Sequence, residues 1–309
     1  MKAPNATSAP TADRTTPWKW VLLCASAPAV WGTTYVVTTE LLPAGYPVWS
    51  SALRALPAGI IGLLICRQLP WGEWWWKSLV MGLLNMGMFF PLLFISAYRL
   101  PGGLASVLIA CQPLFVAALG YLILKEAPTI WRIVWGLIGI AGIAMMVLDS
   151  DAVVDAWGIV AGIIGAGSMA AGIVLFKKWH RPVGGLTWAS WLLAWAGVML
   201  VPASFLFEGA PPPIDAGAGA GYAWLGIVGA LLAYWAWFGG LGKLPVSAAS
   251  FLPLLSPIVA TLLGIILLQQ YLGLVQWIGF SICLLAIVCA QLPPPARTRK
   301  MDQVPKTRP

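Results

Sequence analysis

Charged residues are scarce in this chain: Asp, Glu, Lys and Arg make up 9% of its 309 residues, whereas hydrophobic residues make up 60%. A soluble domain carries about 25% charged residues, so the composition excludes an ordinary soluble protein. Histidine occurs once, and the five cysteines form no CxxC pair, which leaves no pattern of zinc ligands. Walker, HExxH and GxSxG motifs are also missing, so the sequence predicts neither an ATPase nor one of these hydrolases.

What the chain has instead is a series of long apolar runs. Ten segments are long enough to cross a bilayer core, which needs about 20 residues. They predict an all-α integral membrane protein with ten transmembrane helices in a lipid bilayer. The segments are residues 18–39, 47–66, 76–97, 102–124, 129–148, 157–177, 186–207, 221–241, 246–268 and 272–291.

The few charges indicate how these segments are oriented. The net charge is +8, but the basic residues form no concentrated face, so we expect no nucleic acid partner. All 18 except Arg54 and Arg99 fall at inner helix ends, in inner loops or in the tails, whereas most acidic residues fall on the other side. By the positive-inside rule, both termini are expected in the cytoplasm of a bacterial-type inner (plasma) membrane. Residues 1–17 and 292–309 are expected to be solvated tails, the first of them disordered.

Residues 99–124 and 243–268 repeat one pattern at an offset of 144. Nine of the 26 aligned positions are identical, including the pairs Pro101/Pro245, Pro113/Pro257 and Gly120/Gly264. These are the fourth and ninth segments, which are five spans apart. Because five is an odd number, the second copy must enter the membrane from the opposite side. The sequence therefore predicts two inverted five-helix repeats, 18–148 and 157–291, joined by an outer linker, 149–156. Such repeats are typical of secondary transporters.

Arg54 is the sharpest candidate for a binding residue. It lies about 8 residues into the second segment, roughly 12 Å deep at about 1.5 Å per residue, where a charge is costly and usually faces a cavity or a partner. It could bind an anionic or carbonyl group of a substrate, or it could be a structural arginine paired with Glu40 or with helix-end carbonyls. Glu40, at an outer helix end, is the one plausible proton carrier if transport is coupled to protons.

Other polar and aromatic side chains inside the segments are candidates for the lining of the same site. The expected hydrogen-bonding residues are Thr34, Tyr35, Asn85 and Gln112, and the expected stacking residue is Trp235. Each has a structural alternative: threonine hydroxyls can bond to their own helix, amides can join helices, and tryptophan can pack against helices or lipid. Most of the 19 tryptophans lie near segment ends and are expected to form an interfacial belt.

Several motifs resemble one transporter family. They are Trp31–Gly32, Arg54 followed by Ala58, the run AYRLPGGLAS at 97–106 leading into Gln112–Pro113, and Glu126 after the fourth segment. With ten segments and a duplication, they resemble the EamA-type drug/metabolite transporter superfamily. WGTTYVVTTELLP (31–43) and NMGMFFPLLFISAYRLPGG (85–103) are similar to its blue-pigment (indigoidine) exporter branch. The second half departs from the pattern, because Gln269–Gln270 stand where the first half has Lys125–Glu126.

The resemblance implies export of small metabolites such as amino acids, pigments or amphiphiles. We therefore expect a secondary active exporter of small, amino-acid-derived, pigment-like or amphipathic molecules that works by alternating access, with no cofactor and no bound metal. An importer with the same fold is the first alternative, because inverted symmetry permits either direction. A membrane-embedded transferase is the second, and it would depend on the outer acidic residues Asp149, Asp151 and Asp155.

Overall fold

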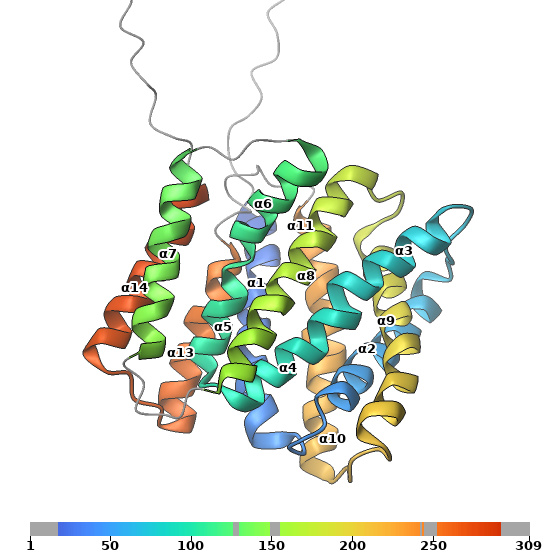
Figure 1. Cartoon of the computed structure of the whole chain (residues 1–309). Helices are drawn as coiled ribbons and strands as arrows, with labels where there is room; N and C mark the ends of the chain where they lie inside the picture. The colour runs from blue at the N-terminus through green and yellow to red at the C-terminus, as the bar shows by residue number, and fades with distance from the viewer. Residues whose placement is uncertain (1–17, 126–129, 149–154, 242, 244–251, 292–309) are drawn as a thin grey trace, which may run out of the picture.

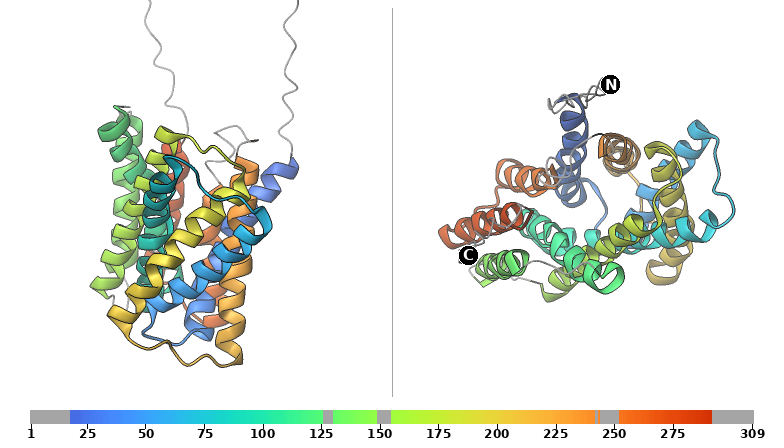
Figure 2. Two further views of the ribbon diagram at one scale, coloured as in Figure 1. Left: turned by 90° about the vertical axis from the view of Figure 1, so that its right-hand side faces the viewer. Right: turned by 90° about the horizontal axis from the view of Figure 1, so that it is seen from above.

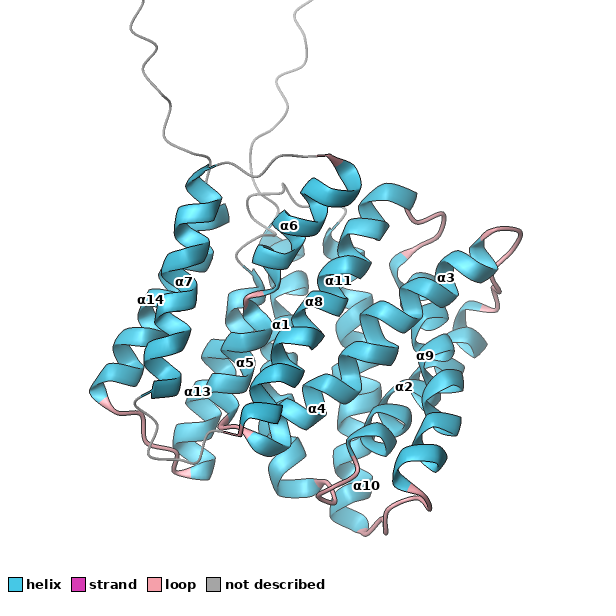
Figure 3. Ribbon diagram, viewed as in Figure 1, coloured by secondary structure: helices cyan, strands magenta, loops and turns pink. Residues whose placement is uncertain are grey.

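The computed structural model describes residues 18–125, 130–148, 155–241, 243 and 252–291. Within these ranges the chain is helical and contains no strand (Figure 3). Seven helices are long and apolar enough to cross a membrane, and shorter apolar helices at Ile133–Gly142, Leu255–Leu268 and Leu274–Ala286 occupy the fifth, ninth and tenth expected segments. The chain is therefore an all-helical, multi-pass membrane protein.

The helices follow one another with short connections, and successive passes alternate in direction (Figure 1). In the first half of the chain they are α1 (Trp18–Leu41), α2 (Pro47–Cys66), α3 (Trp74–Gly82), η1 (Leu83–Met88), α4 (Phe89–Arg99), α5 (Gly102–Ala110), α6 (Gln112–Leu124) and α7 (Ile130–Leu148). In the second half they are α8 (Ala156–Trp179), α9 (Gly185–Glu208), α10 (Ala216–Ala223), η2 (Trp224–Leu232), α11 (Ala233–Leu241), η3 (Leu252–Leu254), α13 (Leu255–Leu268) and α14 (Leu274–Gln291).

Two passes contain a π-helical stretch at their centre. In the third expected segment α3 continues into η1 and then α4, and in the eighth expected segment α10 continues into η2 and then α11. A shift of 144 residues from η1 gives 227–232, which lies within η2. π-helical turns interrupt the regular α-helical hydrogen bonds and often occur at functional sites. The same irregularity thus recurs at the offset found in the sequence repeat.

Helices α2 and α9 pack against each other with almost no side chain between them. A Cβ atom added at Gly59 of α2 would lie 2.4 Å from the backbone nitrogen of Ala194, and one added at Gly197 of α9 would lie 2.5 Å from the Cα atom of Leu56. The two contacts are related by a shift of 138 residues in each partner. Small residues allow such close approach of membrane helices, and the exchange of partners makes this interface self-complementary.

Both ends of the α2–α9 interface are joined by an indole hydrogen bond. At one end Trp49 Nε1 donates to the carbonyl of Gly209 at 3.1 Å, and at the other Trp191 Nε1 donates to the carbonyl of Gln68 at 2.7 Å. The start of α2 therefore lies beside the end of α9, and the start of α9 beside the end of α2, so the two helices are antiparallel.

Helices α7 and α14 form a second antiparallel pair, at the edge of the molecule opposite α2, α3 and α9 (Figures 1 and 2). Cys283 Sγ donates to the carbonyl of Gly139 at 3.2 Å, and these two residues are separated by 144 positions. A Cβ atom at Gly142 would lie 2.7 Å from the carbonyl oxygen of Gly279. In this pair, Gly139 and Cys283, which correspond in the two copies of the sequence repeat, meet directly.

Candidate substrate-binding site

Arg54 lies in α2 and is 1% exposed. Its Nη2 donates to the carbonyl oxygen of Gly229 at 3.0 Å, and its Cζ lies 4.4 Å from the ring centroid of Phe90. Nε and Nη1 have no hydrogen-bond partner. Among the residues that the structure describes, no carboxylate forms an ion pair with Arg54, and Glu40 is exposed. The pairing with Glu40 considered above is therefore not formed. Arg54 does bond to a backbone carbonyl, but this carbonyl lies within η2 and not at a helix end.

The carbonyl that receives Arg54 belongs to the π-helical segment η2. Gly229 lies within η2, and its carbonyl oxygen also accepts a hydrogen bond from Trp31 Nε1 at 3.1 Å. A π-helical turn frees carbonyl groups from the regular ladder. The second half of the chain thus orients a guanidinium group that the first half supplies.

Further aromatic residues lie near this guanidinium. The Tyr234 ring centroid lies 5.1 Å from that of Trp31 and 6.4 Å from that of Phe90. Tyr234 and Tyr35 both lie close enough to Arg54 for an electrostatic interaction. We call Trp31, Tyr35, Arg54, Phe90 and Tyr234 the Arg54 cluster. It combines a buried cation with aromatic side chains, an arrangement that can bind a flat anion.

Two of the expected threonine and tyrosine residues lie at or beside this cluster. Thr34 is 1% exposed and its Oγ1 has no hydrogen-bond partner, and Tyr35 is 3% exposed. The neighbouring hydroxyl of Thr38 instead donates to the carbonyl of Thr34 at 2.6 Å, and that of Thr39 donates to the carbonyl of Tyr35 at 3.2 Å. The structural alternative thus holds for Thr38 and Thr39, whereas the Thr34 hydroxyl is left without a partner.

Asn85 and Gln112 occupy different surroundings. Asn85 lies in η1, where its Nδ2 donates to the carbonyl of Met81 at 2.9 Å and would lie 2.2 Å from a Cβ atom at Gly172 of α8. It stands 144 positions before Gly229, so the amide and the accepting carbonyl occupy corresponding sites in the two π-helical segments. Gln112 is partly buried at the break between α5 and α6.

Trp235, the residue expected to stack on a substrate, lies outside the Arg54 cluster. Its side chain is 43% exposed, whereas the preceding residue, Tyr234, is 3% exposed. Successive helical residues point about 100° apart, because an α-helix has about 3.6 residues per turn. In the run AYWAWF the buried ring is therefore Tyr234, which the sequence analysis missed. Only the helix orientation distinguishes these adjacent aromatic residues.

Several tryptophans near the start of α3 pack against tryptophans of α8 and α9. The edge-to-face pairs are Trp71–Trp191, Trp74–Trp188, Trp75–Trp195 and Trp76–Trp179, with centroid distances of 5.5, 5.9, 6.1 and 5.1 Å. Pairs of this geometry contribute about 0.5–1.5 kcal/mol beyond burial. These tryptophans hold α3 against α8 and α9, which is a structural role in addition to the expected position near segment ends.

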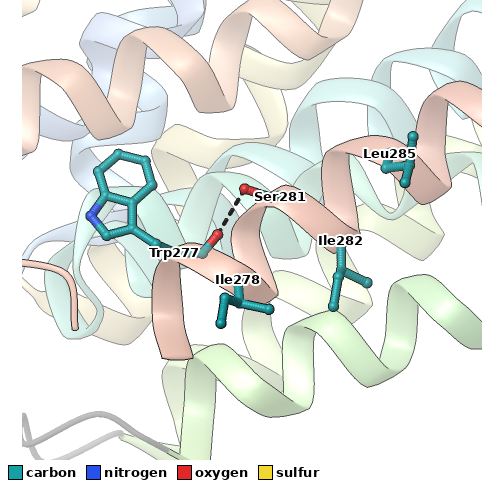
Figure 4. A pocket seen from close by; sticks show the side chains of 5 residues that line it. All are labelled: Trp277, Ile278, Ser281, Ile282 and Leu285. Atoms are coloured by element: carbon teal, nitrogen blue, oxygen red, sulfur yellow. Dashed lines mark hydrogen bonds between the residues drawn. The ribbon is translucent and has the colours of Figure 1, made fainter. Parts of the chain in front are cut away.

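A shallow hollow of about 300 Å³ lies on α14 (Figure 4). Its lining is almost entirely apolar, and the hydroxyl of Ser281 is already bonded to the carbonyl of Trp277 at 2.8 Å. It offers no free polar group for a metabolite and has the character of a surface that faces lipid. The residues that line it are Trp277, Ile278, Ser281, Ile282 and Leu285.

The acidic residues considered for a transferase give no such site in the described chain. Asp149 and Asp151 lie outside the described residues. Asp155 caps α8 by accepting from the backbone nitrogen of Trp157 at 2.7 Å, and it forms an ion pair with Arg99. The hydrogen bond from Arg99 is the main cause of a lowered pKa at Asp155. Over the described ranges, no three His, Cys, Asp or Glu side chains are grouped so as to hold a metal ion.

The long apolar helices define a multi-pass membrane protein. A model of the EamA-like transporter family matches residues 18–148 and 156–291. The chain belongs to this family. As an EamA-family protein it is a membrane transporter of small metabolites.

Individual relatives agree with this assignment. Protein PecM of Dickeya dadantii is 42% identical over 267 residues, which cover 86% of this chain and 90% of PecM. The uncharacterized inner membrane transporter YedA of Escherichia coli is 29% identical, over 85% of this chain and 87% of YedA. A crystal structure that is 18% identical superposes with a TM-score of 0.63, over 88% of this chain and 96% of the other, which shows that the two share a fold.

Proposed function

We propose that this protein is a secondary active exporter that moves small metabolites out of the cell by alternating access. Ten transmembrane helices form two inverted five-helix repeats, 18–148 and 157–291, in a bacterial-type inner membrane with both termini in the cytoplasm. The substrates are amino-acid-derived, pigment-like or amphipathic molecules, as expected for the branch that the sequence resembles.

The observation that carries the proposal is the self-complementary contact between α2 and α9. Gly59 meets Ala194 as Gly197 meets Leu56, and each helix start bonds to the other helix end. This is how the second helix of one repeat meets the second helix of an inverted copy. Two inverted copies give two equivalent arrangements, each open to one side of the membrane, which is the physical basis of alternating access.

The substrate is proposed to bind where the two halves meet at Arg54. In this proposal Arg54 binds an anionic or carbonyl group, and Thr34, Tyr35, Asn85 and Gln112 provide hydrogen bonds as the helices rearrange. The stacking role assigned to Trp235 on sequence grounds passes to Tyr234, because Tyr234 is the ring that lies against Trp31 and Phe90.

An untargeted comparison of extracellular metabolites tests the function. Cells that express the protein are compared with cells that carry an empty vector, and the metabolites that differ are then offered to everted membrane vesicles. Uptake into everted vesicles, driven by an ion gradient, is the result expected for an exporter. Uptake only into right-side-out vesicles would instead make the protein an importer, and identical metabolite profiles would reject transport of cellular metabolites.

A further inference from the structure

We infer that the Arg54 cluster selects a planar aromatic metabolite with a single carboxylate. This inference rests on the proposed function and names the substrate class of the same site. Its basis is the combination of an incompletely bonded guanidinium, a fixed backbone acceptor and aromatic rings in one buried place.

The guanidinium requires an anion. An arginine side chain has five N–H donors, and at Arg54 the only recorded hydrogen bond uses Nη2, while Nε and Nη1 lack partners in a group that is 1% exposed. A buried charge without a counter-charge is costly. In the described chain no carboxylate relieves this cost, so a ligand carboxylate is the complement that the site lacks.

The charge of the ligand follows from the number of cations at the site. Arg54 is the one charged side chain of the Arg54 cluster, and it is 1% exposed. One carboxylate neutralises one guanidinium and accepts two hydrogen bonds in its plane. A dianionic phosphate would leave an uncompensated charge, and a neutral ligand would leave the guanidinium unpaired.

The shape of the ligand follows from the side chains around Arg54. Phe90 covers one face of the guanidinium at 4.4 Å, and Tyr234 bridges Phe90 and Trp31. These rings touch one another in the present arrangement, so a ligand enters as α1, α4 and α11 separate. A flat ring then replaces the contacts that the rings lose, since offset and edge-to-face aromatic pairs are favourable.

The Gly229 carbonyl orients Arg54 in the present arrangement. It accepts from Nη2 and also from Trp31 Nε1, which leaves Nε and Nη1 without a protein partner and available to a ligand. The π-helical segment therefore has a positioning role for Arg54.

The test compares the metabolites exported by cells with the wild-type chain, Arg54→Gln, Arg54→Lys and a matched control on the same helix, Arg67→Gln. Arg67 is exposed at the end of α2. Expression of the four proteins is first adjusted until an immunoblot shows equal amounts in the membrane. We expect the metabolites exported by the wild-type chain to carry an aromatic ring and one carboxylate. Arg54→Gln should lower their export at least about tenfold, because loss of a buried specific polar contact has an effect of this size. Arg54→Lys should lower their export less.

Exported metabolites that are neutral or cationic would overturn the inference, and so would full export by Arg54→Gln, while transport itself would stand. Identical profiles for wild-type and empty-vector cells would reject both proposals. A second measurement uses only the wild-type chain: 4-hydroxybenzoate should compete with export of the identified metabolite, and its uncharged match 4-hydroxybenzamide should not. Equal competition by the two, or competition by neither, would overturn the carboxylate assignment.

Discussion

Alanine at Gly59 provides a direct test of the α2–α9 interface. The new Cβ atom would lie 2.4 Å from the backbone nitrogen and 2.6 Å from the Cα atom of Ala194, and backbone atoms cannot rotate away as a side chain can. The helices must therefore move apart, which also strains the indole hydrogen bonds at both ends. Overpacking of this kind costs roughly 1–3 kcal/mol, so Gly59→Ala should lower the thermal midpoint of the purified protein in detergent micelles.

The matched control is Gly239→Ala in α11, where a new Cβ atom meets nothing within 4 Å. A helical glycine with open space gains about 0.4–1 kcal/mol on replacement by alanine, so the control should raise the midpoint. Gly197→Ala should reproduce the effect of Gly59→Ala, because its Cβ atom would lie 2.5 Å from the Cα atom of Leu56. If Gly59→Ala proved as stable as the control, the close contact between α2 and α9 would be refuted.

Three further outcomes are expected. Glu208→Gln should destabilise the protein by roughly 1–3 kcal/mol, because the Glu208 carboxylate accepts from the first backbone nitrogens of α2 at 2.7 and 2.8 Å; an unchanged melting temperature would contradict this. Asp155 has a lowered pKa owing to its arginine partner, so its stabilising effect is present above its unfolded pKa of about 3.9 and is lost as pH falls through the lowered value. The difference in melting temperature between the wild-type chain and Asp155→Asn should therefore shrink in acid. A difference that stays constant with pH would speak against the ion pair. Tyr234→Leu should reduce export of the identified metabolite, while Trp235→Leu should retain it at equal membrane abundance, and the reverse order would restore the sequence-based assignment.

The sequence was sufficient for the helical membrane class and for the position of one buried charge. Apolar length predicted the membrane helices because a bilayer imposes one dimension on every helix that spans it. Arg54 was recognisable because a charge at that depth requires a partner, and the structure places its guanidinium in the core. The threonines of α1 were recognisable as polar, although most of their hydroxyls bond to their own helix.

The features that depend on helix rotation and backbone irregularity could not be predicted in the same way. The chain around Gly229 is as apolar as a regular helix, so nothing in its pattern indicated a π-helical segment or a carbonyl free to accept from Arg54. Tyr234 and Trp235 are adjacent and equally aromatic, and only the tertiary packing decides which one is buried. The tryptophans of α3 were recognisable as interfacial, but their partners lie more than 100 positions away on α8 and α9.

The partners of α2 have a consequence for how the protein is made. The Glu208 carboxylate caps this helix from 160 positions beyond Val48, and the Gly229 carbonyl accepts from Arg54 at a separation of 175 positions. At a translation rate of about 5–20 residues per second, the ribosome finishes α2 roughly 10–30 s before it supplies either group. During that interval the nascent helix carries an arginine without these partners, whose insertion costs about 2.5–3.5 kcal/mol. The apolar residues of α2 must offset that cost until the second half arrives.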